Sequence, residues 1–181
     1  MSLSFRIALL LLTVALGACG HAHARINVPA SDPASLRQVQ LGTVSVVCTD
    51  KNAATNAPLQ EKLRGWQQLA DQQLRATLAA SSTQLVQPSA TDGTRVPVLS
   101  LTSEVRYGNR ALRWAVGFGA GAGGVNSRLV ATDQSTGTTI FQASAESDLA
   151  IGAAGGDVDK VFRQNLDELL QKYRESLAPR S

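Results

Sequence analysis

A cysteine near the amino terminus stands where its thiol could be chemically modified. Cys19 ends a segment that contains one basic residue, Arg6, an apolar run over residues 7–16 and two small residues, Gly17 and Ala18. This order of basic, apolar and small residues is typical of an export signal that a peptidase removes. As a helix the apolar run is about 15 Å long, roughly half of a hydrocarbon core, so it does not predict a permanent membrane span.

The residues from Leu16 to Cys19 resemble the lipobox of bacterial lipoprotein precursors. The resemblance implies that residues 1–18 are removed as a signal peptide, that Cys19 takes a diacylglycerol group, and that the new amino terminus is acylated, as by palmitate. Two or three acyl chains make such an anchor long-lived, at about 0.8 kcal/mol per buried methylene. The other interpretation is an ordinary secretory signal that ends near a cysteine. Gly20 stands where aspartate favours inner-membrane retention, so we expect the periplasmic side of the outer membrane.

The chain after the signal is long enough for one domain with a hydrophobic core. Residues 19–37 are mostly small, polar or proline, without an apolar period, and we expect them to form a flexible tether. A coil of about 18 residues would reach roughly 20–25 Å. The two histidines of the chain, His21 and His23, lie in this tether without further ligands beside them, so we expect no metal site. A single α+β domain is expected over residues 38–178.

Hydrophobic periodicity in this domain predicts the element order β-α-β-β-β-β-α. Helices are expected over residues 58–80 and 157–176, and strands over 39–48, 84–87, 96–106, 125–133 and 139–148. Apolar residues at helical spacing, with Trp66 and Phe162 among them, are expected to be buried. Gly137 suits the loop of an antiparallel hairpin, and Gly42 marks a change of strand parity that suggests a bulge. These features predict a two-layer α+β sandwich, with a mainly antiparallel sheet and two helices on one face.

The most unusual passage of the domain is a glycine-rich segment over residues 110–124. Its candidate contact residues are Arg110, Arg113, Trp114, Phe118, Gly119 and Gly121. One interpretation is a membrane-contacting or partner-contacting element, in which apolar rings and arginines meet a lipid or protein surface. Another is architecture, in which glycines let strands approach closely while the rings fill the core. The glycine spacing also matches the dinucleotide fingerprint, but a strand rather than a helix follows it, which argues against that function.

This passage also resembles a known family. Residues 113–121, the following strand that ends at Asp133, and residues 136–137 resemble the DUF4410 family of bacterial proteins, many of them predicted lipoproteins. The likeness extends over residues 39–174. The family has no established activity, so the resemblance implies no catalytic residues. Its members have a lysine or a similar residue after the glycines, whereas this chain continues with residues 122–124, Ala-Gly-Gly, which argues against phosphate binding.

The composition argues against an enzyme. The expected domain contains no histidine, which excludes Ser-His and Cys-His nucleophile pairs. Three acids, Asp148, Asp157 and Asp159, are close together in the sequence. Asp157 is expected to cap a helix, and Asp159 is expected to interact favourably with the positive end of that helix dipole. Cys48 is the only other cysteine, and we expect it to be a buried apolar residue; the alternatives are an intermolecular disulfide and a reactive thiol. No cofactor is expected.

The expected function is therefore binding. The formal net charge of the whole chain is only +3, without clustered bases, so nucleic acid is not an expected partner. We expect a lipid-anchored, non-catalytic binding or assembly component of the cell envelope. Its partner would be another envelope protein that contacts the sheet edge or the segment 110–124. The alternative is a small-ligand or lipid-binding module with an apolar cavity between sheet and helices.

Overall fold

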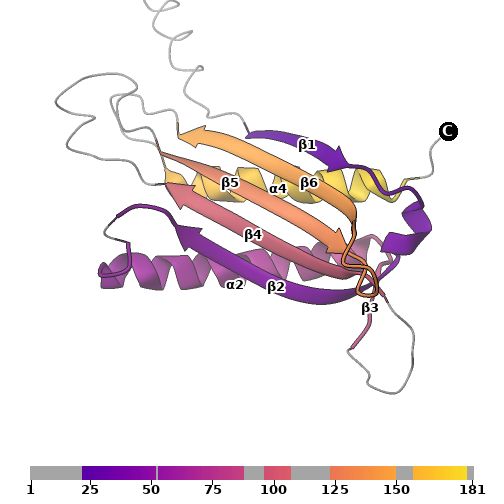
Figure 1. The fold of residues 1–181 in the computed structure, drawn as a ribbon. Coiled ribbons are helices and arrows are strands. Elements are labelled where there is room, and N and C mark those ends of the chain that lie inside the picture. Colours follow the sequence, from indigo (N-terminus) through magenta and orange to yellow (C-terminus); the bar gives the residue numbers. More distant parts are fainter. Residues whose placement is uncertain (1–21, 52, 88–95, 107–122, 150–156, 179–181) are drawn as a thin grey trace, which may run out of the picture.

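The computed structural model describes residues 22–51, 53–87, 96–106, 123–149 and 157–178. The elements in chain order are β1 (Ala22–Val28), the 3-10 helix η1 (Pro33–Leu36), β2 (Gln38–Cys48), α2 (Ala57–Ala80), β3 (Gln84–Leu85), β4 (Val98–Arg106), β5 (Gly123–Thr132), β6 (Thr139–Leu149) and α4 (Val158–Ser176). The strands form one sheet of order β1-β6-β5-β4-β2-β3, and both α-helices lie on one face of it (Figure 1). The predicted two-layer α+β sandwich is confirmed.

The sheet is mainly antiparallel, as predicted. Antiparallel pairing joins β1, β6, β5 and β4, whereas β2 pairs in parallel with both β4 and β3. The predicted hairpin is formed by β5 and β6, and its loop contains Gly137 at a φ of 70°. The predicted bulge is also present, because the register of β2 against β4 shifts between Leu41 and Val44.

The prediction of a flexible tether over residues 19–37 is wrong for most of that range. It contains β1, which pairs with β6 at one edge of the sheet, and η1 follows. Ala24 and Ile26 are partly buried against the core, while His23 and Arg25 are exposed. The strand is therefore amphipathic with a period of two, although its alanines give that alternation little apolar contrast. The domain includes β1, and its element order is β-β-α-β-β-β-β-α.

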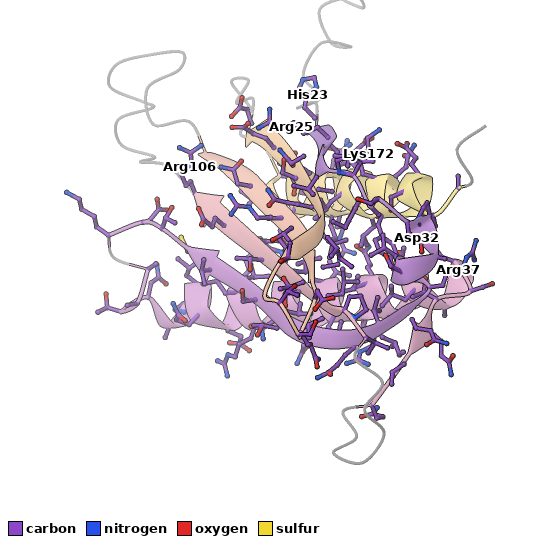
Figure 2. All side chains as sticks on the ribbon, turned by 45° about the vertical axis from the view of Figure 1, so that its right-hand side comes forward. His23, Arg25, Asp32, Arg37, Arg106 and Lys172 are labelled. Carbon is purple, nitrogen blue, oxygen red and sulfur yellow. The ribbon has the colours of Figure 1, made fainter. Side chains whose placement is uncertain are left out.

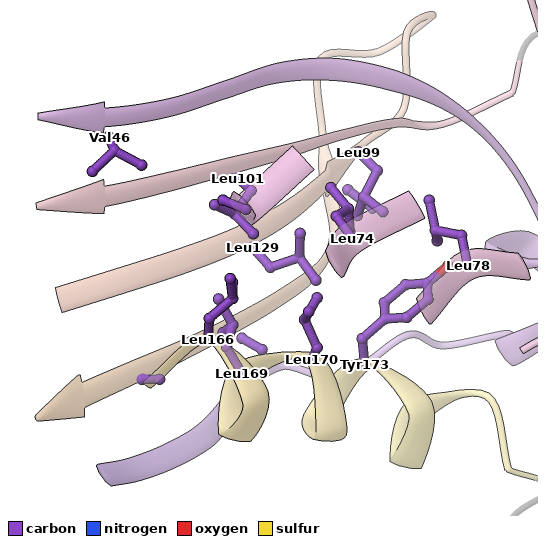
Figure 3. Packing of buried hydrophobic residues seen from close by; sticks show 14 of the residues in the cluster. Val46, Leu74, Leu78, Leu99, Leu101, Leu129, Leu166, Leu169, Leu170 and Tyr173 are labelled. Carbon is purple, nitrogen blue, oxygen red and sulfur yellow. The ribbon is translucent and has the colours of Figure 1, made fainter. Parts of the chain in front are cut away.

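The helices form because an apolar stripe at helical spacing follows a capping residue. Asn56 caps α2 by accepting a hydrogen bond from Leu59 N–H at 3.2 Å, and Asp157 caps α4 by accepting one from Asp159 N–H at 2.9 Å. The leucines of both stripes meet apolar side chains of the sheet (Figure 3). The fully buried members of this core include Leu74, Leu78, Leu99, Leu101, Leu129, Phe141, Phe162, Leu166, Leu169 and Tyr173.

A polar contact inside the core fixes the position of α4 on the sheet. Asn165 is fully buried, and its Nδ2 donates to Val125 O of β5 at 3.1 Å and to Ser147 Oγ of β6 at 2.9 Å. Buried polar groups are costly without partners, so these two bonds favour one register of the helix over its alternatives.

The opposite face of the sheet is polar, and none of the described elements covers it. Thr102, Glu104 and Arg106 on β4 are exposed, while the residues between them are buried. His23 and Arg25 on β1 project from the same face (Figure 2). This clean alternation is typical of an antiparallel sheet with one solvated face. Among the described residues, no helix combines the length and the apolar character that crossing a membrane requires.

The two helices are joined by a small network around an indole ring. Trp66 of α2 stacks on Phe162 of α4, with ring centroids 5.1 Å apart and planes inclined by 15°. Its Nε1 donates to Asp159 Oδ1 at 2.7 Å, and Lys62 Nζ lies 2.7 Å from Asp159 Oδ2. Partial burial raises the pKa of Asp159, but the hydrogen bonds from Lys62 and Trp66, with the charges of Lys62 and Arg163, lower it below its usual 3.8 overall.

This network predicts a loss of stability in acid. Because the folded pKa of Asp159 lies below the unfolded value, the stabilisation is complete well above pH 3.8 and disappears as the pH falls through the lower, folded value. The side chain is 45% exposed, so after screening by water the effect is below about 1 kcal/mol. We expect Asp159→Asn to lower the free energy of unfolding near neutral pH and to have less effect in acid, as measured by urea denaturation. Asp167→Asn, at an exposed position of α4, is the control; an equal pH dependence in both variants contradicts the prediction.

Candidate functional site

The residues that the sequence singled out most strongly lie outside the described part of the structure. They are Cys19 and the candidate contact residues Arg110, Arg113, Trp114, Phe118, Gly119 and Gly121. The flanking positions are described: Arg106 ends β4, and its register partner on β5 is Gly124. A Cβ atom on Gly124 would lie 2.9 Å from Ser147 O of β6, so close strand packing explains this glycine.

The structure instead shows a groove beside an open sheet edge. The short strand β3 pairs only with Gln38 and Val39 of β2. Beyond these residues, no described strand lies on the outer side of β2, and the side of α2 faces the space. The groove has a volume of about 560 Å³. Its lining residues are Gln40, Leu41, Gly42, Val44, Arg64, Gln67, Gln68, Asp71, Arg75, Leu85, Val86 and Gln87.

Helical geometry explains the helix wall of the groove. Each of the five residues that α2 contributes has another of them three or four positions away, so they form one stripe beside its buried face. Asp71 Oδ2 accepts a hydrogen bond from Arg75 Nε at 2.8 Å, and this bond raises the pKa of the guanidinium. Arg64 makes no ion pair among the described residues, so it is the charge in the groove that a ligand could neutralise.

The strand wall of the groove offers backbone groups as well as side chains. Thr49 N–H donates to Val105 O of β4 at 3.2 Å, so alternate residues of β2 direct their backbone toward β4. Of the residues between them, Val44 lines the groove and directs its N–H and C=O toward the open side. Together with the glutamine amides of α2, these groups can donate and accept hydrogen bonds. The groove can therefore form hydrogen bonds with a polar partner.

Two of the three neighbouring acidic residues have structural partners. Asp157 is occupied as the cap of α4, where it accepts hydrogen bonds from Asp159 N–H and Lys160 N–H. Asp159 is bound to the Trp66 network, as described above. The described residues contain no group of three histidine, cysteine or acidic side chains that could hold a metal ion.

Cys48 lies at the end of β2. It is half-buried rather than fully buried, and it packs against the core. Its Sγ donates to Asp50 Oδ2 at 3.6 Å. The prediction of an apolar packing role is therefore correct for the side chain's contacts, while its burial is less complete than expected.

No protein-family model matches this chain, and no curated protein matches its sequence. Two solved structures are similar to it in fold. One is a PelC dodecamer from Paraburkholderia phytofirmans, with 14% identity, a TM-score of 0.45, and coverage of 89% of this chain and 100% of that chain. The other is a substituted variant of the same dodecamer, with 13% identity, a TM-score of 0.45, and coverage of 86% and 99%. Membership of the DUF4410 family stays a prediction.

Proposed function

We propose that this protein is a lipid-anchored component of the bacterial envelope that binds another envelope protein without catalysing a reaction. The lipid on Cys19 would hold it on the periplasmic side of the outer membrane. The observation that carries the binding role is the groove between α2 and the open edge of β2. Sheet edges and the grooves beside them are common sites of protein recognition, because their backbone groups still have hydrogen-bonding capacity.

The position and lining of the groove favour a protein partner over a small apolar ligand. A lipid-binding module needs an apolar cavity enclosed between sheet and helices. Here the corresponding space is filled by side chains such as Leu74, Leu101 and Leu129, each fully buried. The groove lies outside this core, and amide and charged groups dominate its helix wall. Such a surface matches the polar backbone and side chains of another protein.

Crosslinking from the groove tests the proposal. A photoreactive amino acid in place of Gln68 is expected to form an adduct with one envelope protein when cells are irradiated, because Gln68 lines the groove. The same amino acid in place of Gln171, an exposed glutamine of α4, is the matched control and is expected to form no such adduct. The adducts are identified by mass spectrometry.

A second substitution separates specific binding from chance contact. Arg64→Glu reverses the charge that the groove offers, so it is expected to weaken the adduct from position 68 without unfolding the domain, since the side chain is exposed. Two results would contradict binding in the groove. One is an equal yield of adduct from positions 68 and 171, and the other is an adduct from position 68 that Arg64→Glu does not weaken. An adduct with a lipid or another small molecule would support the alternative, a ligand-binding module.

A further inference from the structure

One row of residues marks a common end of the sheet. Ala22 of β1 pairs with Ser147 of β6, which pairs with Val125 of β5; Val125 pairs with Val105 of β4, and Val105 with Cys48 of β2. We call this row of five residues, together with the strand ends beside it, the β1-start end. Figure 1 shows it as the side at which β1 begins and the arrows of β2, β4 and β6 end.

The hairpin loop lies at the opposite end of the sheet. It joins Thr132 to Thr139, and Ser147 follows Thr139 by eight positions along β6. At about 3.3 Å per residue, this strand separates the loop from the β1-start end by roughly 26 Å. The two ends are therefore far enough apart to be distinguished by a probe that acts at short range.

Very little chain separates the proposed lipid from the folded domain. Cys19 precedes Ala22 by three residues. Three residues span at most about 10–11 Å even when fully extended. The 20–25 Å reach of a flexible tether over residues 19–37 is not available, because most of that range is folded into β1 and η1.

We infer that the membrane surface is the docking surface of the β1-start end, and that the sheet stands on the bilayer with its hairpin loop pointing away. The inference rests on the proposed lipid at Cys19, which fixes one point of the chain at the headgroup layer. The short link then holds the first residue of β1 within about 11 Å of that layer. A domain attached in this way keeps the start of β1 near the lipid, whereas the other end of the sheet lies roughly 26 Å farther along the strands.

Two further features of the topology agree with this orientation. The last residue of β4, Arg106, and the first of β5, Gly123, both lie at the β1-start end, so the segment between them is attached on the membrane side. The groove is lined by Gln40, Leu41, Gly42 and Val44 of β2, in the part of that strand farther from Cys48. Its opening is therefore held away from the bilayer, where a periplasmic partner can reach it.

Short-range fluorescence quenching tests this orientation. The full chain, with Cys48→Ser, receives a single labelled cysteine at Asp148→Cys beside the β1-start end or at Thr136→Cys in the hairpin loop; both positions are exposed. The protein is reconstituted into phosphatidylethanolamine–phosphatidylglycerol vesicles that contain a headgroup nitroxide lipid. We expect several-fold stronger quenching at position 148 than at position 136.

A spacer variant supplies the control. Inserting about 15 glycine and serine residues after Gly20 lengthens the link without changing the fold, and it is expected to remove the difference between the two positions. Hydrogen exchange of the unlabelled protein gives an independent measurement: vesicles should protect residues 104–106 and 146–149 in the natural chain and much less in the spacer variant.

The outcomes separate the orientation from the anchor. Equal quenching at positions 136 and 148 in the natural chain, or stronger quenching at 136, means that the domain lies on its β1 edge or hangs freely, and it overturns the inference. The anchor itself is then judged by Cys19→Ser. If this variant leaves the vesicles while quenching is equal, the proposed function stands; if it stays bound, the lipid anchor is wrong.

Discussion

Replacing Cys19 by serine is expected to abolish lipid attachment and to move the protein from the membrane fraction to the soluble fraction. A hydroxyl is a much poorer nucleophile than a thiolate, so the diacylglycerol group is not transferred to the side chain. In the proposed anchor each buried methylene of the acyl chains contributes about 0.8 kcal/mol, so the loss of membrane affinity is expected to be nearly complete. Labelled palmitate and partition into detergent measure the two effects.

Cys48→Ser is the matched control for this prediction, because it removes the other thiol of the chain. Cys48 lies at the end of β2 in the folded domain, far along the sequence from the signal, so this variant should keep both its lipid and its membrane location. Label on Cys19→Ser, or loss of label from Cys48→Ser alone, would place the modification elsewhere and contradict the lipobox assignment.

Trp66→Ala is expected to lower the free energy of unfolding by about 3–5 kcal/mol, as large-to-small changes at buried aromatic positions do. The indole is only 4% exposed, and its removal ends both the stacking on Phe162 and the hydrogen bond to Asp159. The contact between α2 and α4 is weakened as a consequence. Urea denaturation followed by circular dichroism measures the change.

Two variants show which part of the indole matters. Trp66→Phe keeps an aromatic ring against Phe162 but loses the donor to Asp159, so it is expected to cost only about 1–2 kcal/mol. Gln72→Ala, at an exposed position of the same helix, should change stability by less than about 0.5 kcal/mol. If Trp66→Ala proved as mild as Gln72→Ala, the ring would not belong to the core as the structure places it.

The predictions that succeeded relied on local patterns. Burial of Trp66 and Phe162 followed from apolar residues at helical spacing, and Asp157 was recognised as a cap from its place before such a stripe. Gly137 identified the hairpin because a left-handed turn residue stood between two alternating segments. In each case the residues that determine the local structure lie close together in the sequence, so the sequence pattern alone is enough to predict it.

The sequence does not predict β1, because the interactions that identify this strand are not local in the sequence. Ala22 and Ala24 give the strand a weak apolar face, and the strand is held by β6, whose paired residues stand more than a hundred positions later. A segment with two histidines, an arginine and nearby prolines matches a solvated linker equally well when read alone. Only the pairing with β6 distinguishes the two.

The groove could not be located from the sequence for a related reason. The polar flank of α2, with Gln67, Gln68 and Asp71, is visible in the sequence as the solvated side of an amphipathic helix. Its special position depends on β2 lying near the sheet edge and on β3 being only two residues long. Strand order is a property of the assembled sheet, and nothing in the local pattern around Gln40 or Leu85 reports it.

The bulge in β2 bears on how densely the protein can be packed on a surface. Lipid anchoring concentrates copies in two dimensions, and an uninterrupted open strand would then template edge-to-edge aggregation. At Gly42 a Cβ atom would clash with the side chains of Ser100 and Val98, so the close approach that accompanies the bulge favours glycine. The bulge divides the outward hydrogen-bonding groups of β2 into a single residue, Leu41, and a short run from Val44. A neighbouring copy therefore finds no long, regular ladder along β2 on which a fibril could begin.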